Sequence, residues 1–421
     1  MTDNNCKIGR IAFYIGDLGK GGAEHVIRNL AEYFYSQGVE TYMVTKLREE
    51  DEYELSEGIE RIIADITPEE EGGRIHNLMA RIRKLRRIWK EIQPDIIVSF
   101  IRKNNLMALA SAVPLKIPVV VSVRSDPARE FGGGFFERLS FAMFKKAAGI
   151  VVLTAQASEY FPEGLKDKIT VMPNAIDRKF VDVLGAKKEW YGIDESMDPE
   201  EDLVGYMYSK RRHEVITVGR IDDNKNQKML VDAFAMIADK HPDWTLHIYG
   251  DGEGRVDLVE HVVGLDKEHM KEGSYRPGSR DEAGNYANVS DRIVFHGVTD
   301  NVANIMAGRA IFVLPSKMEG MPNALIEAMV MGMACISTDC PCGGPAELIN
   351  DGVNGLLVQV TDVSTMADDL DNLMSDDELR MMLGTQASRL IEKVHPDAVC
   401  RKWREYLEGI VCLHDRYSTE K

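Results

Sequence analysis

This sequence lacks any long apolar stretch: no run approaches the roughly 20 residues that span a bilayer, which excludes an integral helical membrane protein. Its start, "MTDNNCKIGRIAFYIG", lacks a basic segment followed by an apolar core and a cleavage site, so we expect no signal peptide. The six cysteines are scattered without paired zinc-type spacing. We therefore expect reduced thiols and a cytoplasmic location.

An excess of positive charge is also lacking. The net charge of −17 argues against a nucleic-acid-binding protein. The distribution is uneven: residues 1–180 hold 26 lysines and arginines against 25 acidic residues, whereas the remainder holds 25 against 43. A chain of 421 residues also exceeds what one hydrophobic core usually supports. The sequence thus predicts two domains with different partners, 1–182 and 183–395.

Apolar strands and amphipathic helices alternate twice along the chain. "IGRIAFYIG", "DIIVSF" and "GIVVLT" are typical of buried strands in the first half, as are "HEVITVGR", "AIFVLP" and "ACIST" in the second. This alternation predicts an α/β protein with two Rossmann-like, doubly wound parallel sheets. Two segments break the pattern: the acidic stretch 185–212, which suggests a linker, and 264–290, which suggests a surface insertion or a flap over an interdomain cleft.

Ligands of such sheets bind beyond the carboxyl ends of the strands, and four loops that are polar or glycine-rich are expected there. "GDLGKGGAE" contains Gly21 and Gly22, which would let the backbone approach a ligand closely. "VGRIDDNKNQ" contains Gly219, Arg220 and Lys225, and two cations at a helix start suit a diphosphate. The third loop is "YGDGEGR". A tight turn and a solvated charged loop are the simpler interpretations of the first two.

A fourth loop, "SKMEGMPNALIEAM", places Glu319 and Glu327 beside an apolar strand and helix, where ionised groups are rare without a partner. Pro322 suits the first turn of a helix, so we expect the helix to begin there. The amides of four residues would then face an anion or sugar oxygens: Gly320, Met321, Asn323 and Ala324. Two carboxylates that accept hydrogen bonds from hydroxyl groups, placed beside such amides, suit the binding of a nucleotide sugar. Alternatively, Glu319 caps the helix and Glu327 pairs with a cation.

The pair Glu319 and Glu327 forms an E-x7-E pattern that resembles the signature of retaining glycosyltransferases of family 4, which have the GT-B architecture. Further segments resemble this family in the same order along nearly the whole chain: "GGAEHVIRNLAEYF", "VMPNAID", "VGRIDDNKNQ" and "GGPAELINDGVNGLLV". The resemblance implies an acceptor-binding first domain and a second domain that binds a sugar nucleotide. It also implies that a final helix, about 396–421, packs back on the first domain.

The resemblance further implies a role for each position. Arg220 and Lys225 would neutralise the donor diphosphate in place of a metal ion. Glu319 would contact the transferred sugar, Glu327 the ribose hydroxyls, and Gly21 and Gly22 the diphosphate. The donor would be a UDP-sugar that supplies a hexose or N-acetylhexosamine, with no metal and no other cofactor. GDP in place of UDP stays open.

One stretch departs from the family pattern. Many members carry a histidine near the end of the fourth or fifth strand, where this chain has "VVVSVRSDPARE". Our hypothesis is that Arg124 or Asp126 contacts the acceptor or the donor sugar, with Asp126 as a catalytic candidate.

The acceptor is suggested by a basic amphipathic helix at 74–92, which could rest on an anionic membrane surface. Phe131, Phe135 and Phe136 follow on a flexible, glycine-rich loop that could contact lipid or bind the acceptor. We therefore expect a lipid-linked or polysaccharide acceptor in cell-envelope glycan synthesis, on the inner face of the membrane. A solvated helix with an apolar seam is the alternative for 74–92. For the whole chain, the alternatives are a nucleotide-sugar epimerase and a non-catalytic sugar-nucleotide-binding protein.

Overall fold

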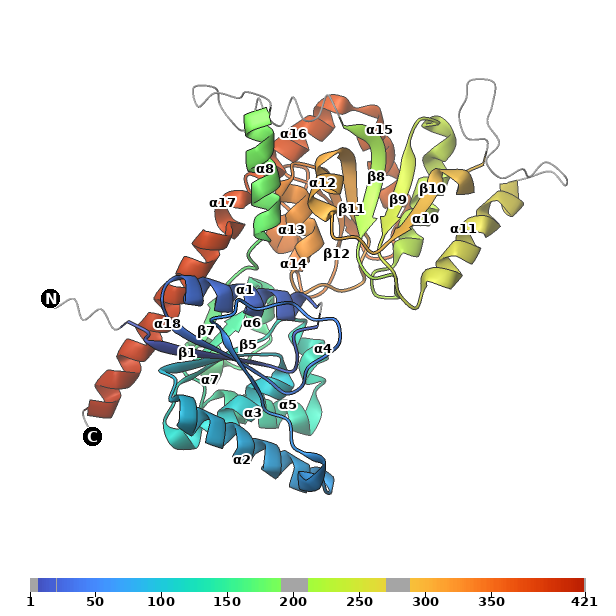
Figure 1. Cartoon of the computed structure of the whole chain (residues 1–421). Coiled ribbons are helices and arrows are strands. Elements are labelled where there is room, and N and C mark those ends of the chain that lie inside the picture. Colours follow the sequence, from blue (N-terminus) through green and yellow to red (C-terminus); the bar gives the residue numbers. More distant parts are fainter. Residues whose placement is uncertain (1–6, 20, 191–210, 270–287, 420–421) are drawn as a thin grey trace. The chain divides into compact units, whose positions relative to one another are not determined.

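The computed structural model describes residues 7–19, 21–190, 211–269 and 288–419 (Figure 1). The chain divides into two compact units, residues 1–175 with 397–421 and residues 176–396. Most of the expected linker and residues 270–287 of the expected insertion, with its flap, lie outside the described residues. Residues 264–269 of that insertion are instead helical, because they complete a helix that begins at Arg255.

The first unit is built on a seven-stranded parallel sheet in the order β3-β2-β1-β4-β5-β6-β7. Its strands are β1 Arg10–Ile15, β2 Glu40–Thr45, β3 Glu60–Ile63, β4 Ile96–Phe100, β5 Val119–Ser122, β6 Gly149–Val152 and β7 Ile169–Val171. Every residue of β4, β5 and β6 is buried. Burial on both faces explains why these segments are almost entirely apolar, with Ser99 and Ser122 as buried exceptions, as the sequence predicts for a parallel sheet.

Helices cover both faces of this sheet (Figure 1). They are α1 Gly22–Ser36, α2 Arg74–Ile92, α3 Arg102–Ala112, α4 Pro127–Phe131, α5 Gly134–Phe144, α6 Ala155–Glu159, α7 Glu163–Lys166 and α18 Pro396–Thr419. Successive residues of β1 point to opposite faces: Phe13 packs against Phe34 of α1, and Tyr14 against Trp89 of α2. Trp403 of α18 joins the core on the α1 side.

The second unit has a six-stranded parallel sheet in the order β10-β9-β8-β11-β12-β13. Its strands are β8 Arg212–Val218, β9 Thr245–Tyr249, β10 Ile293–Gly297, β11 Arg309–Leu314, β12 Ala334–Asp339 and β13 Leu356–Gln359. Its helices are α8 Arg178–Trp190, α10 Gln227–Ile237, α11 Arg255–His269, α12 Val302–Ala307, α13 Asn323–Val330, α14 Gly344–Leu348, α15 Val363–Ser375, α16 Asp377–Ser388 and α17 Ile391–Val394. The predicted pair of doubly wound sheets is therefore confirmed.

Both sheets start in the middle. The first strand of each unit, β1 or β8, pairs on one side with the second strand and on the other with the fourth. The chain order reverses at this place, and the loops that follow the two neighbouring strands diverge from it. Ligands of open parallel sheets bind at such a switch point. In the second unit, the two loops are residues 219–226 after β8 and 315–322 after β11.

Candidate active site

The loops after β8 and β11 are joined backbone to backbone at the switch point of the second unit. The carbonyl of Asn224 accepts a hydrogen bond from the Lys317 amide at 2.7 Å. The Asn224 side chain donates to the carbonyl of Met318 at 3.1 Å. The Asn226 side chain donates to the carbonyl of Pro315 at 3.3 Å. These bonds fix the two loops relative to each other, and therefore fix the side chains that the loops carry.

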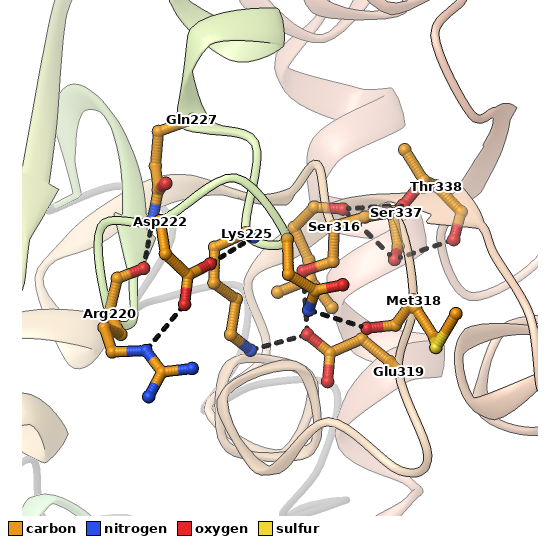
Figure 2. A network of polar contacts seen from close by, with 11 residues as sticks. Arg220, Asp222, Lys225, Gln227, Ser316, Met318, Glu319, Ser337 and Thr338 are labelled. Atoms are coloured by element: carbon orange, nitrogen blue, oxygen red, sulfur yellow. Dashed lines mark hydrogen bonds and ion pairs between the residues drawn. The ribbon is translucent and has the colours of Figure 1, made fainter. Parts of the chain in front are cut away.

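Asp222 organises the first loop (Figure 2). Its carboxylate accepts from the Lys225 amide at 2.8 Å and from Nε of Arg220 at 2.6 Å. Burial by itself would raise the pKa of Asp222, but these donors outweigh it and hold the pKa below its ordinary value. Arg220 exposes 75% of its side chain, so its guanidinium can still turn to a ligand.

The two loops meet through an ion pair between Lys225 and Glu319. Lys225 Nζ lies 2.5 Å from Glu319 Oε1, and the same oxygen accepts a hydrogen bond from Ser316 Oγ at 2.7 Å (Figure 2). The side chains are 24% and 12% exposed, respectively. A largely buried pair of this kind holds a cation and a carboxylate together at the carboxyl edge of the sheet.

Helix α13 begins at Asn323 with Pro322 as its N-cap residue, within one residue of the predicted start. Pro322 makes no side-chain capping bond, and the Glu319 carboxylate bonds Lys225 Nζ and Ser316 Oγ. Gly320 and Met321 lead into the helix, and the positive end of the helix dipole points out beside Glu319. The backbone of Gly344 packs closely against the loop. A Cβ on Gly344 would lie only 2.3 Å from the carbonyl oxygen of Gly320.

Glu327 lies one turn further into α13 and is half-buried. Burial raises the pKa of its carboxyl to about 8, although the charge of Lys179 opposes this rise. Its position on the helix separates it from the Lys225–Glu319 pair. The structure thus places Arg220, Lys225 and Glu319 in one network of loop residues. Glu327 is a second carboxyl, which lies on α13 and not in the loop before it.

The glycines of the third loop serve contact between loops. The Gly219 amide donates to the carbonyl of Tyr249 at 3.0 Å. A Cβ on Gly250 would lie 1.9 Å from the Gly219 carbonyl oxygen, and one on Gly252 would lie 2.3 Å from that of Ile221. Side chains at Gly250 and Gly252 would therefore push away the loop that carries Arg220 and Lys225.

In the first unit, Gly21 is the N-cap residue of α1 and Gly22 its first residue. A carboxylate that sequence reasoning missed, Glu52, holds the preceding turn. It accepts from the Leu18 amide at 3.2 Å and pairs with Arg61 at 2.5 Å. The Arg61 guanidinium lowers the pKa of Glu52 to about 2.

Asp126 is buried and is the N-cap residue of α4, because its side chain accepts from the Ala128 amide at 3.0 Å. This capping bond gives the residue a structural purpose, and its catalytic role stays a prediction. Arg124 lies over the ring of Phe100, 4.8 Å from its centroid, and bonds Asn174. Burial lowers the pKa of Arg124 to about 9.

Sequence reasoning singled out the cations and glutamates of the second unit but missed the groups that position them: Asp222, Asn224, Ser316 and Lys317. The only signal for Asp222 was its place three residues before Lys225, which is a spacing typical of a side chain that closes a turn. The other three were surface-like polar residues in sequence. Among the residues that the structure describes, no group of three or more His, Cys, Asp and Glu side chains is arranged to hold a metal ion.

Comparison with known proteins finds two family models in chain order. The model described as "Glycosyltransferase Family 4" matches residues 20–180, and "Glycosyl transferases group 1" matches residues 212–376. The chain is 24% identical to a Campylobacter jejuni α-1,4-N-acetyl-D-galactosaminyltransferase, named for its GalNAc-GalNAc-diNAcBac-PP-undecaprenol acceptor, over 95% of this chain and 99% of that protein. It is 28% identical to an Escherichia coli UDP-Gal:α-D-GlcNAc-diphosphoundecaprenol α-1,3-galactosyltransferase over 51% and 47%.

The chain spans a smaller share of some other relatives. It covers 63% of a Methanocaldococcus jannaschii glycosyltransferase and 30% of a Streptomyces coelicolor exopolysaccharide phosphotransferase, at 24% identity to each, with 66% and 79% of this chain matched. Among solved structures, Anabaena HepE in complex with UDP superposes with a TM-score of 0.73 at 16% identity, over 95% of this chain and 100% of that one. This likeness shows a shared two-sheet fold.

Proposed function

The chain belongs to the group 1 glycosyltransferases of family 4, and on that premise we propose that it moves a hexose or N-acetylhexosamine from a UDP-sugar to a saccharide acceptor. The reaction retains the configuration at the anomeric carbon and needs no metal ion. Its place is cell-envelope glycan synthesis at the inner face of the membrane.

The observation that carries this proposal is the Lys225–Glu319 pair at the switch point of the second sheet, 2.5 Å apart. A diphosphate at this edge would bind the ammonium of Lys225 and the exposed guanidinium of Arg220. Glu319, released from Lys225, would accept hydrogen bonds from the hydroxyl groups of the transferred sugar. The amides of Gly320, Met321, Asn323 and Ala324 line the same end of α13, and Glu327 would hold the ribose.

The chemistry follows from these groups. The bond between the anomeric carbon and the diphosphate oxygen breaks, and its electron pair leaves with UDP. The acceptor hydroxyl oxygen forms the new bond on the same face, and its proton passes to the departing phosphate. Fixed cations and helix amides stabilise the growing negative charge without reorganising. Gly21, Gly22 and Asp126 of the first unit would contact the donor or the acceptor.

The donor and acceptor classes rest on relatives. HepE is bound to UDP, and the E. coli relative is named for UDP-Gal. The C. jejuni and E. coli relatives are both named for undecaprenol diphosphate-linked acceptors. We therefore propose a lipid-linked saccharide as the acceptor, which implies work at a membrane surface. Within the described ranges, no helix is long and apolar enough to cross a membrane.

A screen of sugar nucleotides by thermal shift tests the donor, because a ligand that binds the folded state raises its melting temperature. We expect one UDP-sugar to give the largest shift. The same UDP-sugar should then yield a glycosylated product from a diphosphate-linked saccharide in the presence of EDTA, with the anomeric configuration retained. A changed sugar nucleotide without acceptor would mean an epimerase. Binding without any transfer would mean a non-catalytic protein.

A further inference from the structure

Large apolar side chains are exposed at the beginnings of two helices of the first unit. In α2, Ile75 is 79% exposed, and Leu78 and Met79 are 48% and 43% exposed. In α5, Phe135 and Phe136 are 74% and 67% exposed. Leu139 is 44% exposed. Single exposed apolar residues are ordinary on a protein surface, but clusters at two helix starts mark an interaction surface.

These two helix starts lie at one edge of the unit. α2 and α5 both pack against α3, on the face of the sheet opposite α1 (Figure 1). Each belongs to a connection between parallel strands, and the helix of such a connection runs antiparallel to the strands. The first turns of α2 and α5 therefore lie at the carboxyl edge of the sheet, where the loops that bind ligands are also found.

The backbone lifts the start of α5 out of the core. Gly132, Gly133 and Gly134 have φ values of +68°, +70° and +73°, a conformation that side-chain-bearing residues rarely adopt. Phe131, just before these glycines, is only 2% exposed and packs against four aromatic rings. Its predicted lipid contact is therefore wrong. Three glycines thus separate a core aromatic residue from the exposed Phe135 and Phe136.

Positive charge continues along α2 from its apolar first turns. The helix holds seven lysines and arginines and one acid, Glu91, in a chain of net charge −17. Three of the cations bond to the protein, since Arg81 and Lys84 contact Asp65 and Arg86 contacts the Ala110 carbonyl. The other four are exposed and form no ion pair among the described residues: Arg74, Arg83, Arg87 and Lys90.

We propose that the first turns of α2 and α5 form a docking surface for an anionic phospholipid bilayer. Phenyl rings and aliphatic side chains enter the boundary of the acyl chains, while the exposed arginines meet phosphate headgroups. Charge complementarity selects this occupant: a helix that exposes apolar side chains in its first turns, and further along cations without ion pairs among the described residues, matches an anionic headgroup layer. The surface turns the carboxyl edge of the first sheet toward the lipid. Given the proposed function, a lipid-linked acceptor would be presented at that edge.

Flotation of the full chain with lipid vesicles tests the surface. We expect the chain to float with phosphatidylcholine vesicles that contain phosphatidylglycerol, and to float less with phosphatidylcholine alone or at high salt. Phe135→Ser with Phe136→Ser should weaken the partitioning roughly tenfold or more, and Ile75→Ser with Met79→Ser similarly. Val256→Ser with Val298→Ser, at exposed valines of the second unit, is the matched control and should float as the wild type does.

Equal flotation of the wild type and both patch variants would overturn the proposal. A change in oligomeric state between the wild type and a patch variant, measured by light scattering, would also overturn it. The surface would then be occupied by a second copy of this chain. Circular dichroism confirms that the variants fold. Transfer to a water-soluble acceptor separates the two proposals: vesicle binding without any transfer would leave the docking surface standing and reject the proposed function.

Discussion

Lys225 and Glu319 are each other's counter-ion in the structure, largely shielded from water. A diphosphate that approaches Lys225 competes with Glu319 for the ammonium. The carboxylate that is displaced then becomes available for hydroxyl groups, so binding of the phosphate and recognition of the sugar are coupled through one side-chain exchange. This coupling distinguishes the roles of the two residues experimentally.

Replacing Glu319 by Gln keeps the shape of the side chain and the hydrogen bond from Ser316 but removes the charge. We expect UDP to bind the variant as well as the wild type or more tightly, because Lys225 loses its competitor. Turnover should fall about 100-fold, since the sugar loses a charged acceptor. Calorimetry with UDP and steady-state kinetics measure the two effects. Glu260→Gln, at an exposed position of α11, is the control. Loss of UDP binding in parallel with turnover would contradict the coupling.

Glu327 predicts a pH dependence. Its folded-state pKa of about 8 lies above the ordinary value of 4.5, so the folded chain favours the protonated carboxyl. That stabilising contribution is complete below pH 4.5 and is lost as the pH rises through 8. Glu327→Gln should therefore gain stability relative to the wild type between pH 5 and pH 9, by about 2 kcal/mol.

Denaturant unfolding across this pH range measures the stability of Glu327→Gln against the wild type. If the ionised carboxylate holds the ribose, donor binding at pH 7 should also release a proton in the wild type but not in the variant. Calorimetry in buffers of different ionisation enthalpy detects that release. A stability difference that is the same at pH 5 and pH 9 would show that Glu327 is not desolvated.

At the scale of residues, the sequence revealed chemistry better than geometry. Arg220, Lys225 and Glu319 could be chosen because cations and carboxylates at strand ends have few structural uses. Asp126 was chosen because it lies in the stretch where many members of the family carry a histidine, yet it caps α4. Nothing in the sequence distinguishes a carboxylate that caps a helix from one that meets a ligand, because both follow a strand and precede a helix.

Among the elements, the turn before α14 supports the loop that carries Glu319. The Glu319 amide donates to the Pro341 carbonyl at 2.9 Å, and Gly344 packs directly against the backbone of Gly320. The segment "GGPAE" therefore has a structural role, because Gly344 has no side chain and allows its backbone to approach that of Gly320. The position of the carboxylate depends on that approach.

Gly344→Ala places a methyl group 2.3 Å from the Gly320 carbonyl oxygen, so one backbone must move. We expect kcat/KM to fall about 100-fold, as for a misplacement of about 1 Å in a catalytic loop. Gly264→Ala in α11 has no atom within 4 Å of its added Cβ and should keep full activity. Steady-state kinetics with both variants decide the matter, and wild-type activity in Gly344→Ala would show that the contact does not position Glu319.

The elements themselves were largely predictable. Buried strands such as β4 and β5 are almost entirely apolar, and α13 begins where Pro322 suggested. The contacts between loops were not predictable, because Gly250 and Gly344 serve partners distant in the sequence. In sequence, a glycine in a loop predicts only a turn. The fold is needed to show which other backbone segment packs against that glycine.

Across the whole molecule, the two ends of the sequence share a core. α18 buries Val399, Trp403 and Leu407 with β1 and α1 of the first unit. Trp403 is fully buried and lies 6.1 Å from Phe100, ring centre to ring centre. The first unit therefore needs residues that follow the whole second unit in sequence, although its sheet is complete by residue 171.

Trp403→Ala should destabilise the first unit by about 3–5 kcal/mol, because removal of the buried indole leaves a cavity in the core. Trp403→Phe should cost less, since its ring still fills part of the site and no buried N–H remains. Chemical denaturation measured by tryptophan fluorescence and circular dichroism provides the comparison. A loss below 1 kcal/mol in Trp403→Ala would mean that α18 adds little to the first unit.

The most direct measurement is the binding of UDP-sugar to EDTA-treated protein by calorimetry, in the wild type and in Lys225→Met. We predict that the wild type binds without added metal and that the variant binds about 100-fold more weakly, because a fixed cation that meets the diphosphate is lost. Lys228→Met, in the first turn of α10 and paired with Asp232, should bind as the wild type does. Binding that requires Mg²⁺, or equal affinity in Lys225→Met, would contradict a donor site built on protein cations.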